Sequence, residues 1–239
     1  MTTETRERQL LETFAALADT LVEGYDVLVL LQHLVDACHD LLDASAAAIL
    51  LADPSGELDV MASTSEASRL VELIQIGAEA GPCVESFRSG REVSVPDIAE
   101  CPDDWARFRE SALALGFSSV HAVPMRLREK VIGTLNLLGD HTGELDEPDR
   151  IAARAFADVA TIGILHERSL RETALLAEQL QGALSSRIVI EQAKGVVAYT
   201  RGVTIEQAFD LIRGYARSHQ VGISQVAARI VDRSLRLEE

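Results

Sequence analysis

Apolar residues recur along the chain with two different periods. At 6–22 and at 27–42 they fall at helical spacing, which predicts two N-terminal helices. An apolar run at 46–52, an Asp-Pro-Ser-Gly turn sequence and an alternating segment from Glu57 predict a strand, a hairpin turn and a second strand. In this interpretation an antiparallel sheet begins at Ala46.

The middle of the chain mixes short helical and strand patterns. Helical periodicity is present at 67–76, 83–89 and 103–115, and one short strand is expected around Val93. Two further strands, at 118–127 and 131–139, are joined by a tight turn, which again predicts a hairpin. This order is typical of an α+β fold in which one antiparallel sheet of about five strands is flanked by helices.

From Pro148 onward the apolar period is helical and long. It continues to Leu184, which indicates a coiled-coil-like connector helix suited to dimerisation; two helices broken near Arg168 are the alternative. After Ser185, two glycines, Gly202 and Gly222, divide the chain into three short helices. The chain is therefore expected to end in an all-α three-helix bundle.

The bundle pattern also predicts caps and a core face. Thr204 and Gln207 have the spacing of a capping box for the second helix, and Ser224 is the candidate cap of the third. At about 100° per residue, one face of the first helix carries Val189, Ile190, Ala193, Val196, Val197 and Thr200. We therefore expect an N-terminal helix at 1–26, the α+β domain at 27–165, the connector at 166–184 and the bundle at 185–239.

Net charge changes sign along the chain. The whole sequence has 22 Lys and Arg against 38 Asp and Glu, a formal charge of −16, which argues against a nucleic-acid partner if the charge is evenly spread. Residues 1–170 contain 13 basic and 30 acidic residues, whereas 171–239 contain 9 basic and 8 acidic residues. The acidity therefore belongs to the N-terminal region, and the bundle is near neutral.

Basic residues in the bundle are arranged in strips. Arg187, Lys194 and Arg201 are spaced by seven and drift only about 20° per step. Arg213 with Arg217, and Arg229 with Arg233 and Arg236, are expected to form similar strips on the other two helices. Tyr199, Phe209 and Tyr215 lie near them and could stack on unpaired bases, although Phe209 is expected in the core. Ordinary solvated helix faces would produce the same strips and remain the alternative.

The stretch 187–231 resembles the ANTAR domain, a three-helix RNA-binding module of bacterial transcription antiterminators. The matching residues are Arg187, Ile190, Ala193-Lys194-Gly195, Gly202, the segment Glu206–Phe209, Ala216 and Val226-Ala227. The resemblance implies binding of a stem-loop in a nascent transcript, prevention of a terminator hairpin, a homodimer through the N-terminal and connector helices, and no enzymatic activity. The RNA-binding residues that it implies are Arg187, Ala193, Lys194, Gly195, Arg201, Arg213 and Tyr215.

Residues 27–165 resemble the GAF domain, a family of small-molecule sensors. The segment 81–98 is similar to the family's Gly-Pro, helix, Gly, strand and Asp sequence, and 123–139 is similar to its closing hairpin. The resemblance implies an unknown small-molecule ligand or partner, since a fold does not fix its ligand. We expect Cys83, Trp105, Phe108 and His121 to line a cavity between the sheet and the middle helices.

No cofactor is expected in this domain. The Asn-Lys signature of cyclic-nucleotide-binding GAF domains is absent, because the single asparagine, Asn136, precedes a leucine. Cys38-His39 could attach a bilin but lies before the first strand, and His121 could ligate haem but is a lone strand histidine. Three scattered cysteines provide neither a disulfide framework nor a metal site.

Two alternatives to an RNA-binding regulator remain. Cys83 begins a helix, where the macrodipole would lower its pKa, so Cys83 and Cys101 could serve a cysteine-dependent redox enzyme. The bundle could instead bind DNA, although Ala227 and Ala228 occupy positions where a base-reading helix needs polar residues. The N-terminus is polar and no apolar stretch approaches the roughly 20 residues of a membrane-spanning helix. We therefore expect a cytoplasmic, signal-responsive regulator.

Overall fold

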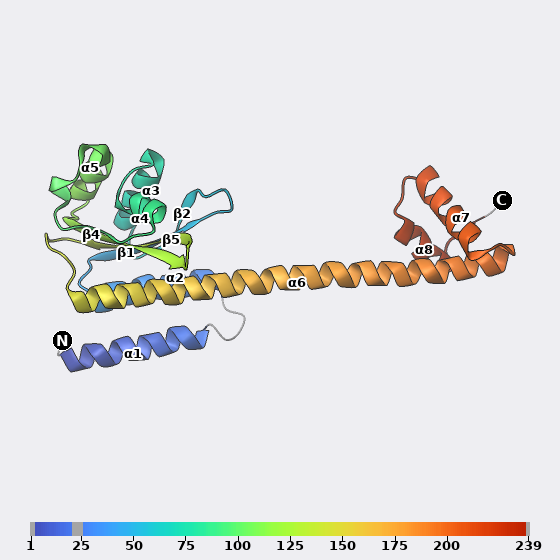
Figure 1. The fold of residues 1–239 in the computed structure, drawn as a ribbon, viewed down its shortest axis with the longest axis horizontal. Coiled ribbons are helices and arrows are strands. Elements are labelled where there is room, and N and C mark those ends of the chain that lie inside the picture. The colour runs from blue at the N-terminus through green and yellow to red at the C-terminus, as the bar shows by residue number, and fades with distance from the viewer. Residues whose placement is uncertain (1–2, 21–25, 238–239) are drawn as a thin grey trace. The chain divides into compact units, whose positions relative to one another are not determined.

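A computed structural model describes residues 3–20 and 26–237. Contacts within the chain divide it into two compact units, 1–168 and 169–239. The long helix α6 (Glu147–Arg201) begins in the first unit and ends in the second (Figure 1).

The first unit contains a five-stranded antiparallel sheet. Its strands are β1 (Ala46–Ala52), β2 (Leu58–Ser63), β3 (Val93–Val95), β4 (Ser119–Leu127) and β5 (Lys130–Gly139), in the order β2-β1-β5-β4-β3. The β1–β2 turn forms because the Asp53 carboxylate accepts hydrogen bonds from the backbone N–H groups of Ser55 and Glu57. The sheet confirms the α+β class and the strands that the sequence pattern predicted.

Helices cover both faces of this sheet (Figure 1). Helices α3 (Glu66–Ala78), α4 (Pro82–Ser89) and α5 (Ala106–Ala114) lie on one face, which we call the α3 face. Two short 3₁₀ helices, Ile98–Glu100 and Asp103–Trp105, precede α5. The first turns of α6 and helix α2 (Val27–Leu41) pack on the opposite face, the α6 face.

Alternation along the strands produces a separate core on each face. In β1, Ala47, Ile49 and Leu51 pack beneath α2 and α6, whereas Ala48 and Leu50 pack on the α3 face. The run is apolar at every position because both faces of β1 are covered. This explains why the sequence shows a continuous apolar run at 46–52 and no alternation.

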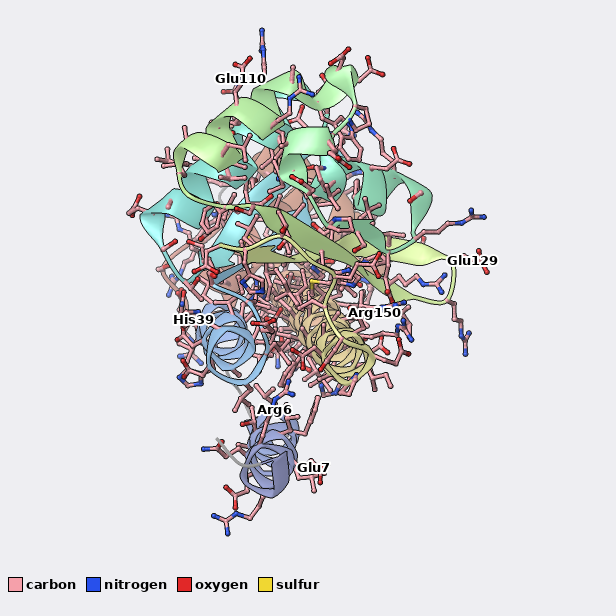
Figure 2. The ribbon with its side chains drawn as sticks, turned by 90° about the vertical axis from the view of Figure 1, so that its left-hand side faces the viewer. Arg6, Glu7, His39, Glu110, Glu129 and Arg150 are labelled. Carbon is pink, nitrogen blue, oxygen red and sulfur yellow. The ribbon has the colours of Figure 1, made fainter. Side chains whose placement is uncertain are left out.

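Helix α1 (Thr3–Thr20) packs outside α2 and α6. The Arg6 guanidinium donates to the backbone carbonyl of Leu41 at 2.7 Å and forms an ion pair with the buried carboxylate of Asp149. Arg6 extends from α1 toward these helices in Figure 2. The ring of Phe14 stacks on that of Phe156 with centroids 4.5 Å apart. The expected C-terminal end of this helix, at Val22, lies outside the described residues.

The second unit is a small three-helix module. The last turns of α6 pack with α7 (Ile205–Ser218) and α8 (Ile223–Val231). The predicted capping box is present: Gln207 N–H donates to Thr204 Oγ1 at 3.2 Å, and Thr204 N–H donates to Gln207 Oε1 at 3.0 Å. The buried core residues of the module are Ala193, Val197, Ala208, Ile212, Ala216, Val226, Ala227 and Ile230.

Helix α6 passes Arg168 without a break, which confirms the predicted long helix and excludes the alternative of two helices. Three other helix expectations were wrong. The helix also continues past Ser185, so the first helix of the module is the C-terminal part of α6. Val196 and Thr200, expected in the core, are exposed because the core centres on Ala193 and Val197. The N-cap of α8 is Gly222, which precedes the expected cap Ser224.

The expected strip Arg229, Arg233, Arg236 does not form on one helix. Helix α8 ends at Val231, and Arg233 has the left-handed backbone angle φ of 67°. The chain turns back because Leu235 N–H donates to the carbonyl of Arg229 at 2.8 Å, and Leu235 and Leu237 then pack against the core of the module. Burial of Leu235 and Leu237 against the core therefore ends the helix at Val231.

Candidate functional site

Two of the expected RNA-binding cations meet at one aromatic ring. Lys194 Nζ of α6 and the guanidinium carbon of Arg213 of α7 each lie 5.7 Å from the centroid of the Phe209 ring. Both distances fall within cation–π range. Phe209 is half-buried and is not part of the module core, so the core expectation for it was wrong, and its ring contacts the two cations. This arrangement places two positive charges from different helices on one surface.

The carboxylates beside these cations are local and exposed. Lys194 Nζ pairs with Glu191 at 2.9 Å, and Arg213 pairs with Asp210 at 2.9 Å, both at i, i+3 spacing. The Lys194 side chain is only 17% exposed, but both carboxylates and Arg213 are largely exposed. Pairs with such exposed partners contribute about 0–1 kcal/mol, because water and salt screen them. A phosphate group can therefore replace either carboxylate at little cost.

The other expected RNA-binding residues lie in different surroundings. Arg187 and Arg201 are exposed and have no ion-pair partner within the described part of the chain. Ala193 is fully buried in the module core, so its small size serves packing. Gly195 is exposed, and a Cβ added there would meet nothing within 4 Å, so packing inside this chain does not require glycine.

Two tyrosines of the second unit present aromatic surface, and at about 100° per residue Tyr199 lies about 140° around α6 from Lys194. The Tyr215 ring is half-buried and stacks on the His219 ring with centroids 3.9 Å apart. Tyr199 is 90% exposed on α6. The sequence pattern placed Tyr199 near the basic strip but gave no reason to rank it above Tyr215. Its exposure makes it the more accessible of the two for stacking.

The four expected ligand residues of the sensor unit do not share one cavity. Trp105 and Phe108 line an open cleft of about 450 Å³ at the end of α3. His121 borders a separate cavity of only about 20 Å³. Cys83 lines neither of them. The single cavity expected between the sheet and the middle helices is therefore not formed by these residues.

His121 lies on the α6 face because of strand alternation. It has the same parity on β4 as Val123 and Met125, which pack beneath α2 and α6. Its Nε2 is 3.5 Å from a carboxylate oxygen of Glu92. Burial lowers the pKa of His121, and the charge of Glu92 opposes that shift. The expectation that His121 faces the middle helices was thus wrong.

Cys83 belongs to a closed polar cluster on the α3 face, which we call the Glu72 cluster. Gln75 Nε2 donates to Glu72 Oε2 at 2.9 Å, and the Cys83 backbone N–H donates to Gln75 Oε1 at 3.0 Å. Gly81 permits this contact, because a Cβ there would lie 2.3 Å from Gln75 Oε1. The side chains of the cluster, all fully buried, are Glu72, Gln75, Cys83 and Asn136.

Electrostatics in this cluster oppose thiol reactivity. Burial raises the pKa of Glu72 to about 7, although Cys83 and Asn136 nearby lower it in part. Burial, followed by the charge of Glu72, raises the pKa of the Cys83 thiol well above its ordinary value. The expected activation by the helix macrodipole is therefore outweighed. Burial also raises the thiol pKa values of Cys38 and Cys101, and all three cysteines are free.

Within residues 3–20 and 26–237, no helix combines the length and apolar character needed to cross a bilayer. No group of three or more His, Cys, Asp or Glu side chains in the same ranges could hold a metal ion.

Comparisons with known proteins identify both units. The GAF domain model matches residues 25–165 and the ANTAR domain model matches 178–231. No curated protein matches the sequence.

Solved structures support the fold of the first unit. A GAF domain of a phosphoenolpyruvate-protein phosphotransferase from Coxiella burnetii is 16% identical over 68% of this chain and 96% of that chain, with a TM-score of 0.55. The corresponding GAF domain from Acinetobacter is 16% identical over 71% and 97%, with a TM-score of 0.51. A free methionine-R-sulfoxide reductase from Neisseria meningitidis, solved with its substrate, is 17% identical over 69% and 91%, with a TM-score of 0.54.

At these identities the similarity concerns the fold alone, because a domain of a phosphotransferase and a reductase share it. The family models reach further, since they cover both units in the order in which they occur. The chain therefore belongs to the GAF family and joins a GAF domain to an ANTAR domain, the architecture of a regulator with a sensor and an RNA-binding output domain.

Proposed function

We propose that this regulator binds stem-loops in nascent transcripts and so prevents transcription termination, under the control of a small molecule or partner bound by the GAF domain. The observation that supports this most directly is the Lys194–Phe209–Arg213 cluster, which lies within the residues matched by the ANTAR model. In this role the protein holds an RNA hairpin and catalyses no reaction. The raised pKa of the Cys83 thiol favours that view over a cysteine enzyme.

Each part of the surface has a distinct task in the proposed complex. Lys194, Arg213 and the unpaired Arg187 and Arg201 neutralise phosphates of the stem. Sequence-specific recognition of RNA usually targets unpaired loop bases, which stack on aromatic rings. Tyr199, with its exposed ring, offers such a platform. Arginines thus position the stem while the tyrosine contacts the loop.

A homodimer through the N-terminal and connector helices completes the proposal. Along α6 an apolar stripe follows the spacing of a coiled-coil seam, and its large side chains are 56% to 58% exposed. A second copy of the chain would cover this stripe. Because the same helix belongs to both units, a ligand that alters the helix pairing in the GAF domain changes the spacing of two RNA-binding modules. The members of the stripe are Leu170, Ala177, Leu180, Leu184 and Ile188.

Fluorescence anisotropy with the full chain and a labelled RNA of two adjacent hairpins tests the RNA-binding proposal. We expect Lys194→Ala and Arg213→Ala each to weaken binding by about three- to tenfold, because one solvent-accessible phosphate contact contributes about 1 kcal/mol, the net value of a typical hydrogen bond. Each should also reduce the slope of log affinity against log salt by about 0.7 to 0.9, the value of one phosphate contact. The control is Arg8→Ala, an exposed α1 arginine paired with Glu12.

Two results would refute the proposal. One is the absence of salt-sensitive binding to hairpin RNA in the presence of candidate ligands. The other is an unchanged affinity and salt slope in both variants. Competition with duplex DNA separates the DNA-binding alternative, because an RNA-binding module should keep its hairpin when excess duplex is added.

A further inference from the structure

The GAF domain has a second hollow whose lining differs from that of the Trp105 cleft. It is a groove of about 700 Å³ formed by the residues after α4, the outer part of β4, the β4–β5 turn and the beginning of α6. Small-molecule sites commonly measure about 300 to 1,000 Å³. The groove is lined by four arginines, Arg91, Arg126, Arg128 and Arg154. We call it the arginine groove.

This concentration of arginine is unusual for its surroundings. Residues 1–170 contain 13 basic and 30 acidic residues, yet four of the 13 line this groove. Arg91, Arg126 and Arg128 form no ion pair with any residue that the structure describes. The acidic region therefore leaves three guanidinium groups without a carboxylate partner in one place.

The acidic residues that line the groove do not neutralise it fully. Glu92 neutralises one of the four arginines, because it accepts from Arg154 Nε at 2.7 Å, and it also lies 3.5 Å from His121. Asp158 on α6 lies near Arg154 and Arg126, and burial raises its pKa despite their charges. Glu129 is at the tip of the β4–β5 hairpin, which projects from the domain in Figure 2. Its exposed carboxylate is free to turn into solvent.

The groove follows an unpaired stretch of sheet edge. β3 pairs with β4 only at Val120–Ala122, so beyond Ala122 the edge of β4 opposite β5 has no strand beside it. An added peptide strand would need backbone donors there, but Pro124 has no N–H group. The arginine side chains, in contrast, each present five N–H donors and no acceptor. This edge therefore suits an anion better than a strand.

We propose that the arginine groove is a binding site for a small molecule that carries a phosphate group or clustered carboxylates. Guanidinium groups bind such oxygens in pairs of parallel hydrogen bonds, and several converging arginines provide them from more than one side. Arg154 and Asp158 lie on α6, the helix that continues into the ANTAR-matched residues, so the bound anion contacts that helix directly. This proposal depends on the proposed function in one respect: it takes the GAF domain to be the part of the protein that binds the signal.

Isothermal titration calorimetry of the full chain, without RNA, tests this site with two probes. Pyrophosphate represents phosphate chemistry and citrate represents clustered carboxylates, each compared with sodium chloride at equal ionic strength. We expect saturable binding of at least one probe, and Arg126→Gln with Arg128→Gln should weaken it at least tenfold. These two side chains have no ion pair to lose, so the variant should keep its thermal unfolding midpoint. The matched control, Arg88→Gln, removes an exposed α4 arginine outside the groove.

Each result of the titration either supports or overturns the proposed anion site. Binding that is lost in the groove variant and kept in the control supports the site, and the stronger probe identifies its chemistry. Heats no larger than those of sodium chloride, or equal binding by both variants, overturn it. If the groove variant instead loses hairpin RNA affinity while pyrophosphate binding is absent, the arginines serve the RNA and the proposed site is wrong. Since no RNA is present in the titration, failure here leaves the proposed RNA function unaffected.

Discussion

At the scale of single residues, the buried Glu72 makes the stability of the GAF domain depend on pH. Its folded-state pKa of about 7 lies above the ordinary value of 4.5, so the folded protein holds this proton more tightly than the unfolded chain. The resulting stability is complete below about pH 4.5 and is lost as the pH rises through 7. A shift of this size corresponds to about 3 kcal/mol. We expect Glu72→Gln to be more stable than the natural chain by up to that amount at pH 8, in urea unfolding.

The decisive measurement is how the difference in unfolding free energy between Glu72→Gln and the natural chain changes with pH. Because the pKa of His121 is lowered, its contribution to the stability of the fold is lost as the pH falls. The contribution of Glu72 is lost as the pH rises. Subtracting the unfolding free energy of the natural chain from that of Glu72→Gln removes the His121 contribution. The difference should increase between pH 5 and 8. Asp59→Asn, a change at an exposed carboxylate of β2, is the control and should show no such increase. If the difference in unfolding free energy for Glu72→Gln does not change with pH, the raised pKa of Glu72 is contradicted.

At the scale of elements, α6 makes a prediction about assembly. Leu180 and Leu184 lie on the apolar stripe and are each 58% exposed, so replacing both with glutamate places four charges in the proposed seam of a dimer. We expect Leu180→Glu with Leu184→Glu to halve the mass measured by light scattering. Leu175→Glu is a matched control, because Leu175 is 53% exposed and lies about 140° and 180° around the helix from the other two. Equal masses for the double variant and the natural chain would contradict the seam.

The elements also show what the sequence could and could not predict. β1, β4 and β5 were predictable because short apolar runs bounded by turn residues are typical of buried strands. The continuity of α6 through Ser185 could not be predicted, because helical periodicity is the same in one long helix and in two helices aligned end to end. The end of α8 depends on Leu235 returning to the core, which is a tertiary contact. The Cys83 environment likewise depends on Glu72, eleven residues away in the sequence and on another helix.

At the scale of the whole molecule, the −16 charge bears on specificity for RNA. Because the acidic residues are concentrated in the first 170, we expect that region to repel RNA from surfaces other than the basic side of the ANTAR module. Changing Glu57, Glu85, Glu100 and Glu110, all exposed, to glutamine should strengthen binding to unrelated duplex RNA severalfold at 20 mM salt. The effect should largely disappear at 150 mM salt, where the screening length falls to about 8 Å. Glutamate to aspartate at the same four positions keeps the charge and should change nothing. If the glutamine variant binds unrelated RNA no better at low salt, the acidic domain has no part in selecting the RNA.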